Sequence, residues 1–76
     1  MKKLALTHIK ANKKYKIVDV AADANLKSKL MSMGVYPGKE IIKLSHIGLK
    51  GPVVIKAGRS MLALGHSMAA KIVVEA

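Results

Sequence analysis

Short runs in which apolar and polar residues alternate dominate the chain, and this period of two predicts β-strands. The runs lie at residues 15–20, 40–46, 52–57, 61–64 and 71–74. Glycine, proline and asparagine residues between them are typical of turns. Five short strands with brief connections in so small a chain indicate a closed or nearly closed barrel, because closure removes exposed strand edges.

Two of these runs are irregular. In the first, Ile17 and Val18 are adjacent apolar residues, which indicates either a β-bulge or a strand that is buried on both faces. In the second, Ile42 and Leu44 share one face while Ile41 lies on the other. Neither face of that strand is therefore purely polar.

Helical spacing replaces alternation along residues 26–33, where apolar residues recur at i, i+4 and i+7. Asp23 and Asn25 are both suitable N-caps for this short helix. Gly34 supplies a left-handed C-cap, and Pro37 prevents the helix from resuming. The apolar stripe consists of Leu26, Leu30 and Met33.

Further turns complete the predicted outline. A helical turn at residues 66–70 precedes the last strand. Another, at residues 8–10, would be capped by Thr7, and Asn12 would adopt a left-handed conformation that leads into the first strand. Gly58 and the residue after it form the expected turn of a β-hairpin.

Length and composition indicate a single domain, residues 1–76, in which 51% hydrophobic residues suffice for a core. The chain has no cysteine, which excludes disulfides and thiolate metal sites and fits a reducing compartment. No apolar stretch approaches the ~20 residues of a membrane span, and the one near the N-terminus is too short for a secretion signal. We therefore expect a soluble, cytoplasmic protein.

Charge is the most unusual property of the composition. Lysine and arginine number 14 against 4 acidic residues, which gives a net charge of +10, and Arg59 is the only arginine. Lysine is a hydrated point charge, whereas arginine offers a planar fork for bidentate recognition. The balance favours diffuse attraction to acidic surfaces, including weak attraction to anionic lipid or nucleic acid.

Candidate chemistry is sparse. No nucleophile and base are paired by spacing, and no phosphate-binding loop of the Walker type is present, so we expect neither an enzyme nor a cofactor. His8, His46 and His66 are far apart in sequence, and we expect surface or half-buried histidines without a metal. A basic nucleic-acid-binding barrel is the main alternative, although Tyr15 and Tyr36 are the only aromatic rings for base stacking.

Four segments together resemble the FeoA family, small cytosolic proteins of bacterial ferrous-iron uptake whose domain also occurs in iron-dependent repressors. The resemblance extends over residues 6–74, nearly the whole chain. The segments are Leu30-x-x-Met33-Gly34-Val35-x-Pro37-Gly38, Leu49-x-Gly51-Pro52-Val53-x-Ile55, Gly58-x-x-x-Leu62-Ala63-Leu64 and Ala69-x-x-Ile72-x-Val74.

Three places depart from the family pattern. Ala11-Asn12 stands where Pro-Gly is usual, and Gly65 stands where arginine is common. The loop before the third strand has Gly48 and Lys50 where a proline and a glycine are usual. Asparagine adopts the same turn as glycine, so these changes leave the expected fold intact.

The resemblance implies a mainly β fold, a small SH3-like β-barrel of about five strands with one short helix and a helical turn. It also implies a partner, the ferrous-iron permease with its cytosolic GTP-binding domain. The expected function is a non-enzymatic accessory protein that docks on that domain. An exposed methionine beside lysines on the helix suits such contact, although isolated surface methionines are also common. The candidate partner-binding residues are Leu26, Lys27, Met31, Tyr36 and Arg59.

Overall fold

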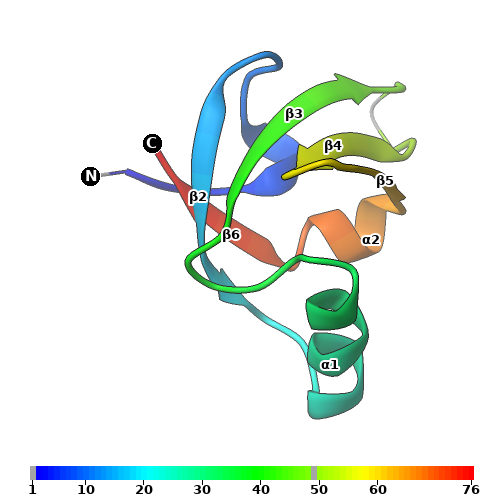
Figure 1. Cartoon of the computed structure of the whole chain (residues 1–76). Helices are drawn as coiled ribbons and strands as arrows, with labels where there is room; N and C mark the ends of the chain where they lie inside the picture. The colour runs from blue at the N-terminus through cyan, green and yellow to red at the C-terminus, as the bar shows by residue number, and fades with distance from the viewer. Residues whose placement is uncertain (1, 49) are drawn as a thin grey trace.

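The computed structural model describes residues 2–48 and 50–76, so Leu49, in the predicted loop at 48–51, and Met1 lie outside the described residues. Its main element is one antiparallel sheet with strand order β1-β6-β2-β3-β4-β5 (Figure 1). The elements are β1 (Lys3–Ala5), the 3₁₀ helix η1 (Leu6–His8), β2 (Lys14–Val20), α1 (Ala24–Ser32), β3 (Glu40–His46), β4 (Val53–Ala57), β5 (Ser60–Leu64), α2 (His66–Ala69) and β6 (Ile72–Glu75).

The prediction of a mainly β fold is confirmed, but the predicted closed or nearly closed barrel of about five strands differs from the structure in two respects. The sheet has six strands, and it is open, with β1 and β5 as its edges. Helical segments cover the core where strand closure was expected: α2 packs against η1, and both Leu6 and Ala69 are fully buried. The extra strand, β1, has only three residues, which are too few to show a period of two.

A β-bulge interrupts β2, which decides between the two alternatives for the first predicted run. The register with β6 shifts between Ile17 and Asp19. Residues three apart point to opposite faces of a regular strand, yet Ile17 and Val20 are both buried. The bulge resets the alternation, so both side chains reach the core.

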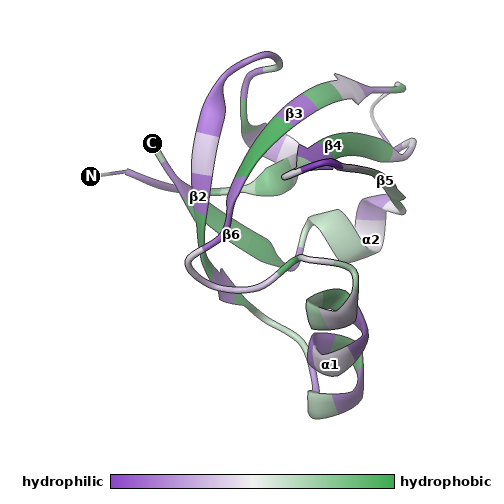
Figure 2. Cartoon of the chain, viewed as in Figure 1, coloured by the Kyte–Doolittle hydropathy of each residue, from purple (hydrophilic) through white to green (hydrophobic). Residues whose placement is uncertain are grey.

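The core lies between the concave face of the sheet and the helical segments. Figure 2 shows strongly hydrophobic stretches along β4 and β6, near the middle of the molecule. On β3 the buried face carries Ile41 and Lys43, whereas Ile42 and Leu44 are half-buried on the outer face. The largest fully buried side chains are Leu6, Ile17, Leu30, Ile41, Ile55, Ile72, Val35, Val53 and Val74.

The ends of α1 follow the capping residues. The N–H of Leu26 donates to Asp23 Oδ1 at 2.8 Å, so Asp23 is the N-cap rather than Asn25, and the helix begins two residues earlier than predicted. Gly34 follows with φ +88°. The predicted stripe is confirmed, because Leu30 is fully buried and its two neighbours on the stripe pack against the core.

The N-terminal turn differs from its prediction. It is a 3₁₀ helix at Leu6–His8, two residues earlier than expected, and Thr7 lies inside it rather than at its N-cap. The fully buried Leu6 side chain anchors this turn to the core. Asn12 has φ +62°, as predicted for the turn into β2.

Candidate functional site

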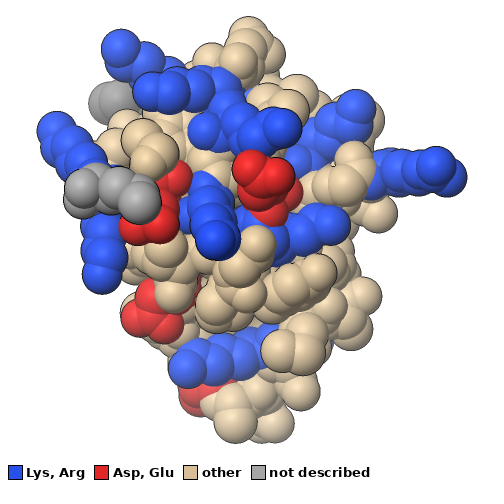
Figure 3. Space-filling view, turned by 60° about the vertical axis from the view of Figure 1, so that its left-hand side comes forward, with Lys and Arg blue, Asp and Glu red and all other residues tan. Residues whose placement is uncertain are grey.

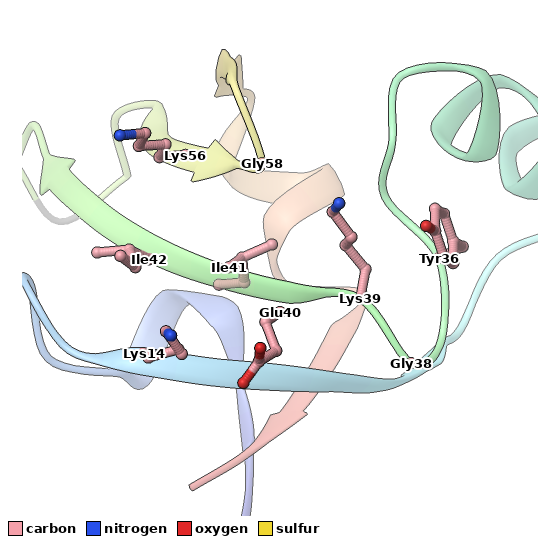
Figure 4. A pocket seen from close by; sticks show the side chains of 9 residues that line it. All are labelled: Lys14, Tyr36, Gly38, Lys39, Glu40, Ile41, Ile42, Lys56 and Gly58. Carbon is pink, nitrogen blue, oxygen red and sulfur yellow. The ribbon is translucent and has the colours of Figure 1, made fainter.

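An open cleft of about 490 Å³ lies on the outer face of the sheet, across β2, β3 and β4 (Figure 4). Its centre is a row of directly paired residues, in which Ile42 lies opposite Lys14 on one side and opposite Lys56 on the other. Six of the nine lining residues are exposed, so the cleft is open to solvent. The lining residues are Lys14, Tyr36, Gly38, Lys39, Glu40, Ile41, Ile42, Lys56 and Gly58.

Positive charge predominates in this cleft, which we call the lysine cleft. Three lysines line it, and Glu40 is the one carboxylate among the lining residues. The ammonium group of Lys39 lies over the β4–β5 turn, since a Cβ added to Gly58 would sit 3.2 Å from Lys39 Nζ. Figure 3 shows the same bias at larger scale, with lysine and arginine side chains spread over one face and acidic groups as isolated patches.

A second, smaller pocket of about 80 Å³ adjoins α1, and we call it the helix pocket. It brings together three of the predicted partner-binding residues, Lys27, Met31 and Tyr36. Lys27 and Met31 are four residues apart on α1 and therefore share a face. Tyr36 also lines the lysine cleft, so it is shared by the two hollows. The remaining lining residues are Asp19, Val20, Val35 and Pro37.

Exposure makes the helix pocket suitable for contact. The Met31 side chain is 60% exposed and the Tyr36 side chain 36%. The other two predicted residues lie elsewhere: Leu26 packs against the core, and Arg59 is exposed in the β4–β5 turn. Neither lines the lysine cleft or the helix pocket.

The sequence interpretation missed the lysine cleft. Lys14, Lys39 and Lys56 belong to three different segments, and only the strand register makes them neighbours of one isoleucine. The alternation of polar and apolar residues does place Lys14 and Lys56 on the outer face of their strands, but it does not specify which strands pair. The composition shows the excess of lysine, but it does not predict that three lysines gather in this cleft.

An unexpected polar cluster lies at the other end of β3. Lys43 is only 4% exposed, and its Nζ donates to the carbonyl oxygen of Ile9 at 3.0 Å. The same nitrogen lies 3.3 Å from His46 Nδ1. The ring of His46 stacks on that of His66, with 5.9 Å between the ring centroids.

Burial changes the titration of two of these groups. Loss of water lowers the pKa of Lys43, and the nearby Tyr15 opposes this effect in part. The pKa of His46 is also lowered, first by loss of water and then by the positive charges of Lys43 and His66. Both shifts favour the neutral forms.

In the described part of the chain, residue types that ligate metals do not cluster around the two stacked imidazoles. Within residues 2–48 and 50–76 no group of three or more His, Asp or Glu side chains converges, and His8 is exposed on η1. None of the helices in the described part of the chain is long and apolar enough to cross a bilayer.

Known proteins match both the sequence and the fold. The model of the FeoA domain family matches residues 4–76. An iron uptake regulatory protein, FeoA, is 28% identical with a TM-score of 0.86, and the match covers 99% of this chain and 97% of that one. Iron(II) transport protein A from Clostridium thermocellum is 29% identical with a TM-score of 0.86, covering 95% and 44% of the two chains. No curated protein shows significant similarity to this chain.

A third structure relates the architecture to a known fold class. FeoA of Stenotrophomonas maltophilia, solved with zinc and described as a prokaryotic SH3 domain protein, is 21% identical with a TM-score of 0.78. The match covers 95% of this chain and 89% of that one, so the open six-stranded sheet is SH3-like. Because the family model covers nearly every residue, this chain belongs to the FeoA family.

Proposed function

We propose that this protein is a non-enzymatic accessory factor of ferrous-iron uptake, and that it docks on the cytosolic GTP-binding domain of the permease. Membership of the FeoA family supports the link to iron transport. The observation that carries the docking proposal is the helix pocket, where Lys27, Met31 and Tyr36 meet beside the lysine cleft. An apolar centre with polar groups around it is the usual arrangement of a protein–protein interface.

The two hollows would contribute differently to binding: the helix pocket supplies apolar contact, and the lysine cleft supplies electrostatic attraction. Methionine is flexible and polarisable, so an exposed Met31 adapts to the shape of a partner surface. A tyrosine ring adds rigid contact area at low entropic cost. The surrounding lysines accelerate encounter with an acidic face, and salt screens this effect.

Binding to the purified GTP-binding domain of the permease tests this proposal. We expect measurable binding at 50 mM salt and progressively weaker binding at 150 and 500 mM. Met31→Asp should weaken binding at least tenfold, because it places a carboxylate in the apolar part of the contact. Met61→Asp is the matched control, since Met61 is 68% exposed on β5 and lines neither hollow.

The outcomes separate the general proposal from its local form. No binding at low salt would overturn docking altogether. Equal effects of the two aspartate variants would move the contact away from the helix pocket. Single-stranded nucleic acid is the weaker candidate, because Tyr15 is 4% exposed and only Tyr36 presents a ring for stacking. Tight, sequence-selective RNA binding in a gel-shift assay at 150 mM salt would reverse this ranking.

A further inference from the structure

We propose that the lysine cleft binds an acidic, strand-like peptide segment, with carboxylates over Lys14 and Lys56 and an aliphatic side chain over Ile42. This inference rests on the proposed function, because it identifies the kind of partner segment that docking would use. The helix pocket supplies a separate apolar contact, so the two parts of the surface are testable independently.

The spacing of the charges defines the ligand. Lys14, Ile42 and Lys56 are direct neighbours on three adjacent strands. Strands in a sheet lie about 4.8 Å apart, so the two lysine Cα atoms are separated by about 10 Å. Side chains at positions i, i+2 and i+4 of an extended peptide share one face, so carboxylates at i and i+4 flank an aliphatic side chain at i+2. These carboxylates lie about 13 Å apart, a span that the long, flexible side chains of the two lysines can reach. Figure 4 shows Lys56 and Lys14 on opposite sides of β3, with Ile42 between them.

The floor of the cleft favours a peptide over a small anion. Ile42 is half-buried and offers apolar surface that phosphate would leave uncovered. Lysine is the only cation in the cleft, whereas bidentate recognition of phosphate favours arginine, and Arg59 does not line it. A hollow of about 490 Å³ has room for several side chains.

Glu40 makes the charge of the cleft uneven, because it is a negative group among lysines. It pairs across the strands with Lys16, next to the row that contains Ile42. A partner carboxylate placed over Glu40 would be repelled, while one placed over Lys14 or Lys56 would be attracted. Such a combination of repulsion and attraction restricts where in the cleft a partner carboxylate can lie. We therefore expect the partner segment to place a neutral or basic residue opposite Glu40.

A matched pair of triple variants tests this proposal. Lys14→Gln/Lys39→Gln/Lys56→Gln removes the charge of the cleft. Lys10→Gln/Lys50→Gln/Lys71→Gln removes three exposed lysines that line neither hollow. Each triple removes three charges from the net charge of +10, so both proteins carry +7. Thermal unfolding of each variant verifies that it is folded.

Three probes are used with each protein at 150 mM salt. They are a fluorescein-labelled peptide Ser-Glu-Ser-Val-Ser-Glu-Ser, the same peptide with both glutamates replaced by glutamine, and the GTP-binding domain of the permease. We expect the cleft triple to weaken binding of the acidic peptide and of the permease domain at least tenfold. The control triple should weaken both less than threefold, and the glutamine peptide should not bind.

Ile42→Thr adds a readout that a bare anion site would not give. Threonine keeps the β-branched shape and removes apolar contact, so we expect threefold to tenfold weaker binding of the acidic peptide. Inorganic pyrophosphate, used as a competitor of the peptide, should bind the wild type and this variant with the same low affinity. The role of the aliphatic contact would be overturned if Ile42→Thr lost affinity equally for the peptide and for pyrophosphate. It would also be overturned if the variant lost affinity for neither ligand.

The remaining outcomes distinguish this proposal from the proposed function. If the permease domain binds and both triples weaken it equally, docking stands and the peptide cleft is overturned. If the acidic peptide binds the cleft while the permease domain does not bind the wild type, the proposed function fails alone. Vesicles with 30% anionic lipid that bind more tightly than the peptide, with the same loss in the cleft triple, would reassign the cleft to a membrane.

Discussion

Lys43 places its ammonium group inside the core, where it meets the carbonyl oxygen of Ile9 and the imidazole of His46. Moving an ammonium group out of water costs several kcal/mol even after relaxation, and a charge-assisted hydrogen bond returns about 1.5–3 kcal/mol. The lowered pKa of Lys43 reflects this imbalance. We therefore expect Lys43 to lower, rather than raise, the net stability of the fold.

We predict that Lys43→Met raises the free energy of unfolding at pH 7 by about 1 kcal/mol, or about 4–8 °C in melting temperature. Methionine has a similar shape and needs no solvation, although the Ile9 carbonyl loses its donor. Because the pKa of Lys43 is lower in the folded state than the ordinary 10.5, the unfolded chain binds more protons. The wild type should therefore gain stability as pH rises towards 10.5, and the advantage of the variant should shrink.

The control for this prediction is Lys56→Met, which changes an exposed lysine of the same sheet. We expect a change in melting temperature below about 2 °C for this control. Chemical denaturation between pH 7 and 10 measures both variants. A clear loss of stability in Lys43→Met at pH 7 would mean that the bond to Ile9 outweighs the desolvation of the ammonium group.

For single residues, the sequence predicts some side-chain environments but not others. The exposure of Met31 is predictable, because Met31 lies off the apolar stripe of the helix. The burial of Lys43 is not predictable, because a lysine in an alternating strand normally faces solvent. Its orientation is fixed by the pairing of β3 with β4, whose register shifts just after Lys43.

At the scale of elements, local signals define most boundaries. The strand β3 was predicted to the residue, β4 within one residue, and α1 and α2 within two residues. Capping and turn residues explain this agreement, since Asp23, Gly34 and Asn12 act through the backbone next to them. Closure of the sheet was predicted wrongly, because it depends on long-range packing of η1 and α2.

The N-cap of α1 offers a prediction with a built-in control. Asp23→Ala should lower the free energy of unfolding by about 1 kcal/mol, because the N–H of Leu26 loses its acceptor. Asn25→Ala should leave stability unchanged or slightly higher, because alanine favours a helix interior. Urea denaturation of both variants measures the difference, and equal losses would contradict the assignment of Asp23 as the cap.

At the scale of the whole molecule, the dominant property is self-repulsion. A net charge of +10 is carried by a body of 28 × 26 × 23 Å. At 0.01 M ionic strength the Debye length is about 30 Å, so charges on opposite sides still repel each other. At 1 M it is about 3 Å, and the repulsion is almost absent. The folded state concentrates this charge more than the unfolded chain does.

We therefore predict that raising sodium chloride from 10 to 500 mM raises the melting temperature of the isolated protein. The control triple Lys10→Gln/Lys50→Gln/Lys71→Gln, with a net charge of +7, should gain less over the same range. Differential scanning calorimetry measures both. A melting temperature that is independent of salt would show that ion pairing in the folded state compensates for the excess of lysine.

The pairing of β1 with β6 has a consequence for how the domain connects to other chains. Lys3 lies opposite Glu75, and the N–H of Ala76 donates to the carbonyl oxygen of Lys2 at 3.4 Å (Figure 1). Entry and exit points are thus adjacent. Insertion of this domain between two adjacent elements of another protein would therefore require little separation of those elements. For the same reason, a linker of a few residues would suffice to join the two termini in a circular permutant.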